Sequence, residues 1–112
     1  MSDAISQIIA PYKDDAPSYE AFSKLVGFAC IAWNTSLLPP EKQLESFNKV
    51  LALFDDPDLR IDMFALLMAL MARKEKLFPH VSRMIVEHKV TDQGQGFHIA
   101  IASTLEQKNV KK

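Results

Sequence analysis

Ten consecutive residues, from Met63 to Ala72, contain no polar side chain. A helix that is apolar all round is either buried on every side or crosses a membrane. Ten helical residues rise only about 15 Å, half of a bilayer core, and charged residues at 55–62 and 73–76 exclude a longer span. We therefore predict a helix over about 57–76, buried at the centre of the fold, with the other segments packed round it.

Three further helices precede this one, each with its own start or end signals. The first has apolar side chains at i, i+3, i+4 and i+7, the spacing of an amphipathic helix: Ile5, Ile8, Ile9 and Tyr12. The second begins near Pro17, and the third begins at Glu41 after a corner formed by two prolines. Asp56 is placed to cap the central helix, with Pro57 at its first position.

The second helix contains three residues with specific expectations. Trp33 is predicted to anchor the core, with its indole N–H bound to a nearby carbonyl, and Asn34 is predicted to end the helix. Gly27 in mid-helix costs about 1 kcal/mol relative to alanine. We expect another helix to cross closely at that glycine.

The last part of the chain alternates between apolar and polar residues. Residues 86–90 and 97–102 both show this period of two, and the connector between them holds two of the three glycines. We predict a β-hairpin over about 84–104, packed by one face onto the helices. The alternative is an all-α bundle, because residues 97–107 also place apolar side chains on one helical stripe. Residues 109–112 are predicted to be a frayed end.

The predicted fold class is therefore α+β, mostly α: a four-helix core with a C-terminal hairpin, in a single domain over 1–112. A chain of this length buries about 65% of the surface that its unfolded form exposes, so it needs no metal or disulfide for stability. The single Cys30 has no disulfide partner, which indicates a reducing compartment. The N-terminal residues show no export signal, so we expect a cytoplasmic protein.

Charge is distributed unevenly, although the net charge is only −1. Residues 1–72 carry ten acidic and five basic side chains, whereas residues 73–112 carry four acidic and eight basic ones. Such asymmetry fits head-to-tail self-association or a basic face for an anionic partner, although scatter on a solvated surface is the simpler interpretation. All three interpretations remain open.

None of the common catalytic or phosphate-binding motifs occurs in the sequence, and we expect neither enzymatic activity nor a cofactor. The histidines are the remaining candidates for metal chemistry. His88 and His98 fall on the two predicted strands, where they would be near neighbours, with Glu87 or Asp92 as a further ligand. Because Glu87 points away from His88, we interpret both as exposed strand histidines and expect no metal.

Two other groups of residues have structural interpretations that we prefer. Four aspartates gather at the start of the central helix and suit its N-terminus: Asp55, Asp56, Asp58 and Asp62. Four methionines would fill the core, although flexible thioethers also suit an adaptable partner groove: Met63, Met68, Met71 and Met84. Neither group by itself predicts an active site.

A basic set of residues is the candidate partner surface. The end of the central helix, the loop after it and the first strand would bring together Arg73, Lys74, Lys76, His80, Arg83, His88 and Lys89. Arginine would contact a phosphate-bearing partner through paired N–H groups, and lysine through its charge. Only Phe78 and Phe97 are available for base stacking and the pI is near 6.3, so nucleic acid is the less favoured partner.

Residues 32–39, with the sequence AWNTSLLP, resemble a segment of small, uncharacterised bacterial helical proteins. The stretch 73–79, followed by a candidate hairpin, is similar to those proteins too. The resemblance implies a bacterial, cytoplasmic origin and favours the α+β fold. It implies no activity.

The surplus of apolar residues, the charge asymmetry and the lack of catalytic motifs predict a non-enzymatic cytoplasmic interaction or regulatory module that forms a homodimer. The alternative is a nucleic-acid-associated regulator that uses the basic C-terminal face. A small enzyme or metal protein that uses the histidines is the least favoured hypothesis. We expect no membrane association.

Overall fold

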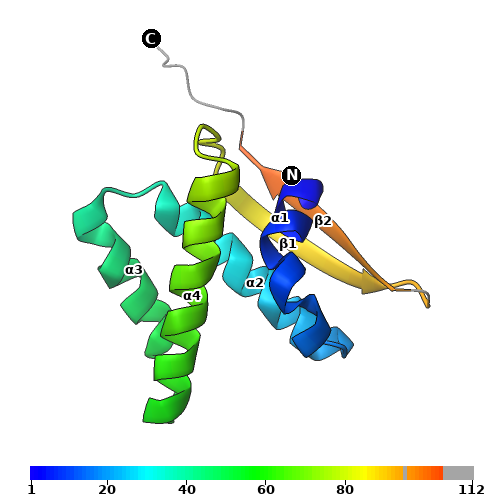
Figure 1. Cartoon of the computed structure of the whole chain (residues 1–112), viewed down its shortest axis with the longest axis horizontal. Coiled ribbons are helices and arrows are strands. Elements are labelled where there is room, and N and C mark those ends of the chain that lie inside the picture. The colour runs from blue at the N-terminus through cyan, green and yellow to red at the C-terminus, as the bar shows by residue number, and fades with distance from the viewer. Residues whose placement is uncertain (95, 105–112) are drawn as a thin grey trace.

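The computed structural model describes residues 1–94 and 96–104, so the predicted frayed end at 109–112 lies outside the described residues. Its elements follow the chain as α1 (Ser2–Ile9), the 3-10 helix η1 (Ala10–Asp15), α2 (Tyr19–Ser36), α3 (Pro40–Leu51), α4 (Pro57–Leu77), β1 (Ile85–Asp92) and β2 (Phe97–Ser103) (Figure 1). The α+β class, mostly α, is confirmed, and the all-α alternative is wrong.

Local sequence explains where the longer helices begin. The Ser18 hydroxyl accepts a hydrogen bond from Ala21 N at 3.1 Å, and so caps α2. The predicted cap of α4 is confirmed, because the Asp56 carboxylate accepts from Asp58 N at 2.9 Å. Pro40 and Pro57 begin α3 and α4, at a position where a missing N–H costs nothing.

The helix at the centre of the fold is α2, not α4 as the sequence predicts. Phe22, Val26, Ala29 and Trp33 of α2 are all buried. α1, α3, α4 and β1 pack against α2, which passes behind α4 in Figure 1. The amphipathic helix α2 thus packs against more elements than α4, the helix that contains the wholly apolar run.

The prediction that α4 is buried on every side is wrong. Leu67 and Leu70 are buried in the core. The opposite side of the same run carries Ala65, Met68 and Ala72, which are exposed. The reason is architectural: among the described residues, the elements that pack against α4 cover only part of its circumference, and no further layer lies outside it.

The hairpin is confirmed and pairs its two strands antiparallel, with Val90 opposite Ile99. Its turn is closed by a hydrogen bond from Gln93 N to Gly96 O at 3.0 Å. A register shift between Ile85 and Glu87 adds one residue to β1. This bulge returns Ile85 to the same buried face as Val90, five residues away.

Candidate interaction surfaces

The predicted basic surface begins with Arg73, whose donors are used inside the molecule. Its Nε donates to Ile8 O at 2.8 Å, and its Nη2 donates to Gln7 O at 2.7 Å. Both carbonyls belong to the last turn of α1, and Gln7 O also accepts from the backbone N–H of Ala10. Arg73 therefore fastens the end of α1 to α4.

Lys74 is the most deeply buried cation of this set, with only 3% of its surface exposed. Its Nζ donates to Val81 O at 2.9 Å and lies 5.1 Å from the centroid of the Trp33 ring. Burial away from water lowers the pKa of the Lys74 ammonium, and the neighbouring Glu75 carboxylate acts in the opposite direction. The carbonyl and the ring face compensate the buried charge.

Arg83 is also engaged, because its Nε donates to Thr104 O at 2.8 Å. The other four members of the set are exposed and come from separate elements: Lys76 on α4, His80 in the following loop, and His88 and Lys89 on β1. His88 and Lys89 are adjacent in a strand and point to opposite faces. The structure therefore leaves fewer free cations here, and in less of a cluster, than the sequence predicts.

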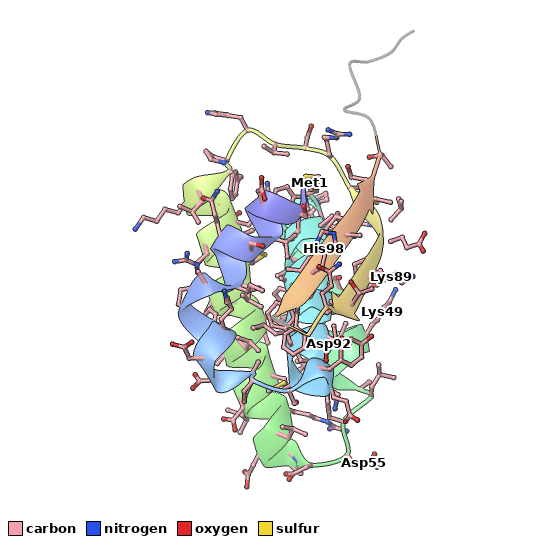
Figure 2. The ribbon with its side chains drawn as sticks, turned by 90° about the vertical axis from the view of Figure 1, so that its right-hand side faces the viewer. Met1, Lys49, Asp55, Lys89, Asp92 and His98 are labelled. Carbon is pink, nitrogen blue, oxygen red and sulfur yellow. The ribbon has the colours of Figure 1, made fainter. Side chains whose placement is uncertain are left out.

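The predicted pairing of His88 with His98 across the hairpin is wrong. His88 lies opposite Ile101, and His98 lies opposite Thr91. Lys89 and His98 can be located on the neighbouring strands in Figure 2. No group of three or more His, Cys, Asp or Glu side chains within residues 1–94 and 96–104 is arranged to hold a metal ion.

Gly27 has a different neighbour from the one expected. A strand, not a helix, crosses α2 there, and the His88 ring lies over the glycine. A Cβ built on Gly27 would be 3.5 Å from His88 Nε2, which is an ordinary van der Waals distance. This glycine therefore permits a close crossing without being required by it.

Trp33 and Asn34 attach the hairpin to α2. The expected role of Trp33 is confirmed, since its Nε1 donates to Arg83 O at 2.7 Å. Asn34 does not end the helix, which continues to Ser36. Its side chain instead accepts from Ile85 N at 2.7 Å and donates to Ile85 O at 2.8 Å. The most distinctive part of the 32–39 segment thus has a structural role.

The outward face of α4 is a surface that sequence reasoning missed. Four residues spaced at i, i+4, i+7 and i+11 form it, and all are exposed: Ile61, Ala65, Met68 and Ala72. Ile61 has 66% of its surface accessible and Met68 has 42%. The signal in the sequence was the uninterrupted apolar run, since an element apolar all round needs a cover on every side. Met68 and Met84, which the sequence assigns to the core, lie outside it, since each is 42% exposed.

A groove opens on the opposite side of α4, against α2 and η1. Leu59, Met63 and Leu66 of α4 form one wall, Phe28 belongs to α2, and Phe54 lies in the connection before α4. The groove has a volume of about 440 Å³. Leu59 and Met63 precede Ile61 and Ala65 by two residues each. They therefore lie about 200° round the helix from Ile61 and Ala65.

Cys30 offers no reactive group at either surface. It is a free thiol that is 5% exposed, and burial raises its pKa from the ordinary value of 9.0 to about 12. The thiolate is the nucleophilic form of cysteine. Cys30 therefore behaves as a small apolar core residue.

No family model, curated protein or solved structure matches the chain. The resemblance of residues 32–39 to small bacterial proteins thus stays a prediction. Among the described helices, none combines the length and the apolar character that crossing a membrane requires.

Proposed function

We propose that this protein is a non-enzymatic interaction module that forms a homodimer through the outward face of α4. The observation that carries the proposal is the exposed apolar stripe of Ile61, Ala65, Met68 and Ala72. Alanines at two of the four positions allow a second helix to approach closely, while the isoleucine and methionine supply apolar contact area. Burial of this stripe against a copy of itself removes apolar surface from water on both chains.

The charges at the two ends of α4 favour an antiparallel pair. Asp58 and Lys76 are both exposed, and each lies nine residues along α4 from the buried Leu67, which is level with the middle of the stripe. Eighteen residues make five full helical turns, so the two side chains lie on the same side of α4. A twofold axis near Leu67 would bring the acidic end of each helix to the basic end of the other. The helix dipoles would also oppose each other favourably.

The nucleic-acid alternative has less support. Arg73, Lys74 and Arg83 donate hydrogen bonds to carbonyls of the same chain, so within residues 1–94 and 96–104 few cations of the predicted basic surface have all their donors available for phosphate. Binding that depends on phosphate contacts falls steeply with salt. We therefore expect a nucleic-acid titration to show either no binding or binding that does not change between low and high salt.

A cytoplasmic location is part of the same proposal. The reduced, buried Cys30 supports it, because a free thiol persists in a reducing compartment. The interaction role needs no cofactor and no metal.

Mass measurement tests the proposed homodimer. Light scattering and sedimentation over a wide concentration range should give a dimer with a dissociation constant in the micromolar range, since one helix pair buries less than a standard interface. Met68→Glu places a charge in the apolar stripe and should weaken the dimer at least about tenfold. Leu53→Glu is the matched control, because Leu53 is 80% exposed and lies outside α4. A wild-type monomer at all concentrations would refute the proposal.

A further inference from the structure

The groove between α4, α2 and η1 is apolar inside. Its lining includes the apolar side chains of Phe28, Phe54, Leu59, Met63 and Leu66. Leu59 is 39% exposed, so this hollow is open to solvent along α4. Its volume is about 440 Å³.

The surroundings of this groove are acidic. The two segments that supply its lining, 12–28 and 54–66, carry six acidic side chains besides Asp58, which lies toward the outward face of α4: Asp14, Asp15, Glu20, Asp55, Asp56 and Asp62. Their basic side chains number three: Lys13, Lys24 and Arg60. Arg60 keeps its charge, and its Nε donates to Phe54 O at the edge of the groove. Asp55 marks the acidic end of the molecule where α4 begins (Figure 2).

An apolar floor with an acidic border selects a partner of the opposite pattern. We propose that the groove binds an amphipathic helix of another protein, with an apolar face inserted into the groove and lysine or arginine along its flanks. Helices α2 and α4 form the walls, and their side-chain ridges can accept a third helix. Neither β1 nor β2 supplies a lining residue, so an extended peptide would find no strand to pair with there.

This site is separate from the proposed dimer face. The groove residues of α4 lie about 200° round the helix from the outward stripe, so a dimer formed through that stripe keeps both grooves free. Each dimer would then present two equivalent sites for basic helices. The inference does not depend on the dimer.

Selection from a displayed library of helical peptides tests the groove. The library fixes apolar residues at i, i+3, i+4 and i+7 and randomises the remaining positions. We expect the selected peptides to be enriched in lysine and arginine at the flanks relative to the input. Selection of no binder, or of binders with acidic or random flanks, would overturn the proposal.

Substitutions that introduce no charge test whether the selected peptide binds in the groove. Leu59→Gln should weaken its binding about tenfold, measured by fluorescence anisotropy, and Asp62→Asn should weaken it severalfold at low salt only. Leu53→Gln and Glu87→Gln are matched controls at exposed positions outside the groove, and should leave binding unchanged. Met68→Glu should also leave it unchanged, which distinguishes failure of this inference from failure of the dimer. Equal binding to wild type and Leu59→Gln would exclude the groove as the site.

Discussion

Asn34 connects the helical part of the molecule to the hairpin with a single side chain. Its amide satisfies both the N–H and the carbonyl of Ile85, which is 51 residues away in the chain. A strand residue normally finds those partners in another strand. The amide therefore takes the place of a neighbouring strand at the start of β1.

Removal of this amide should destabilise the protein. Asn34→Ala leaves a backbone donor and acceptor at Ile85 without partners in a part-buried place, and should cost about 1–3 kcal/mol in the free energy of unfolding. Urea denaturation measures the loss. Asn48→Ala is the control, since Asn48 is an exposed residue of α3. Equal stability of both variants would contradict the structural role of Asn34.

Cys30 makes a separable contribution to the pH dependence of stability. The folded protein keeps the thiol protonated up to about pH 12, whereas the unfolded chain loses this proton near pH 9.0. The thiol's contribution is fully present below pH 9 and is lost as pH rises from 9 toward 12. At pH 10, wild type should have lost about 1 kcal/mol more than Cys30→Ala, relative to pH 7.5. Urea denaturation of both proteins at the two pH values checks this, and identical pH profiles would contradict it.

Residue-level expectations succeeded where local chemistry determines the answer. A buried indole needs an acceptor, so the hydrogen bond of Trp33 was predictable without knowledge of the acceptor. Asn34 was not predictable, because an asparagine near a helix end is common and its true partner is distant in sequence. The same limit applies to Arg73 and Lys74. A cation bound to backbone carbonyls looks, in a sequence, the same as a cation in water.

At the scale of elements, the hairpin depends on the geometry of its turn. Gly94 has a φ of +83°, a backbone conformation that is unfavourable for residues other than glycine. A Cβ at that position would meet nothing within 4 Å, so the cost of substitution comes from the backbone alone. Gly94→Ala should therefore destabilise the protein by about 1 kcal/mol, and Gly94→Asn by less. Thermal denaturation of the two variants compares them, and equal losses would point to a steric cause instead.

The hairpin's strands were predictable but their register was not. Alternation of apolar and polar residues identifies a strand and the face that it buries. The register depends on how many residues the turn uses, and residues 93–96 place His98 opposite Thr91 rather than His88. The bulge near Val86 adds a further offset. The alternation of apolar and polar residues alone therefore predicts neither the register nor the bulge.

Some features of helix α4 (Pro57–Leu77) were also predictable from the sequence, and others were not. Its start and its length follow from Asp56, Pro57 and the apolar run, and the structure agrees. The number of neighbours round a helix depends on the whole fold, so its exposed side was not predictable. The acidic groove was likewise outside the reach of sequence alone, because its lining comes from four separate parts of the chain.

At the scale of the whole molecule, the two faces of α4 would bind different partners. One face would meet a second copy, and the other would form the wall of the acidic groove. The molecule measures 45 × 35 × 22 Å, and α4 lies on one of its broad sides (Figure 1). An antiparallel pair of α4 helices would join two such sides and place the grooves apart.

Disulfide cross-linking between introduced cysteines tests the antiparallel pair most directly. In the proposed arrangement, with the twofold axis level with residue 67, two copies of residue 65 are offset by about 6 Å along the helix axes, whereas two copies of residue 72 are offset by about 15 Å. A disulfide requires Cα atoms within about 7 Å. Cys30 is buried and stays out of the reaction.

The measurement is the fraction of covalent dimer after mild oxidation of Ala65→Cys and Ala72→Cys, read on a non-reducing gel. The antiparallel dimer predicts efficient cross-linking of Ala65→Cys and little cross-linking of Ala72→Cys. Efficient cross-linking of both variants would indicate parallel helices. Cross-linking of neither would show that the outward face of α4 does not meet a second copy, and would contradict the account.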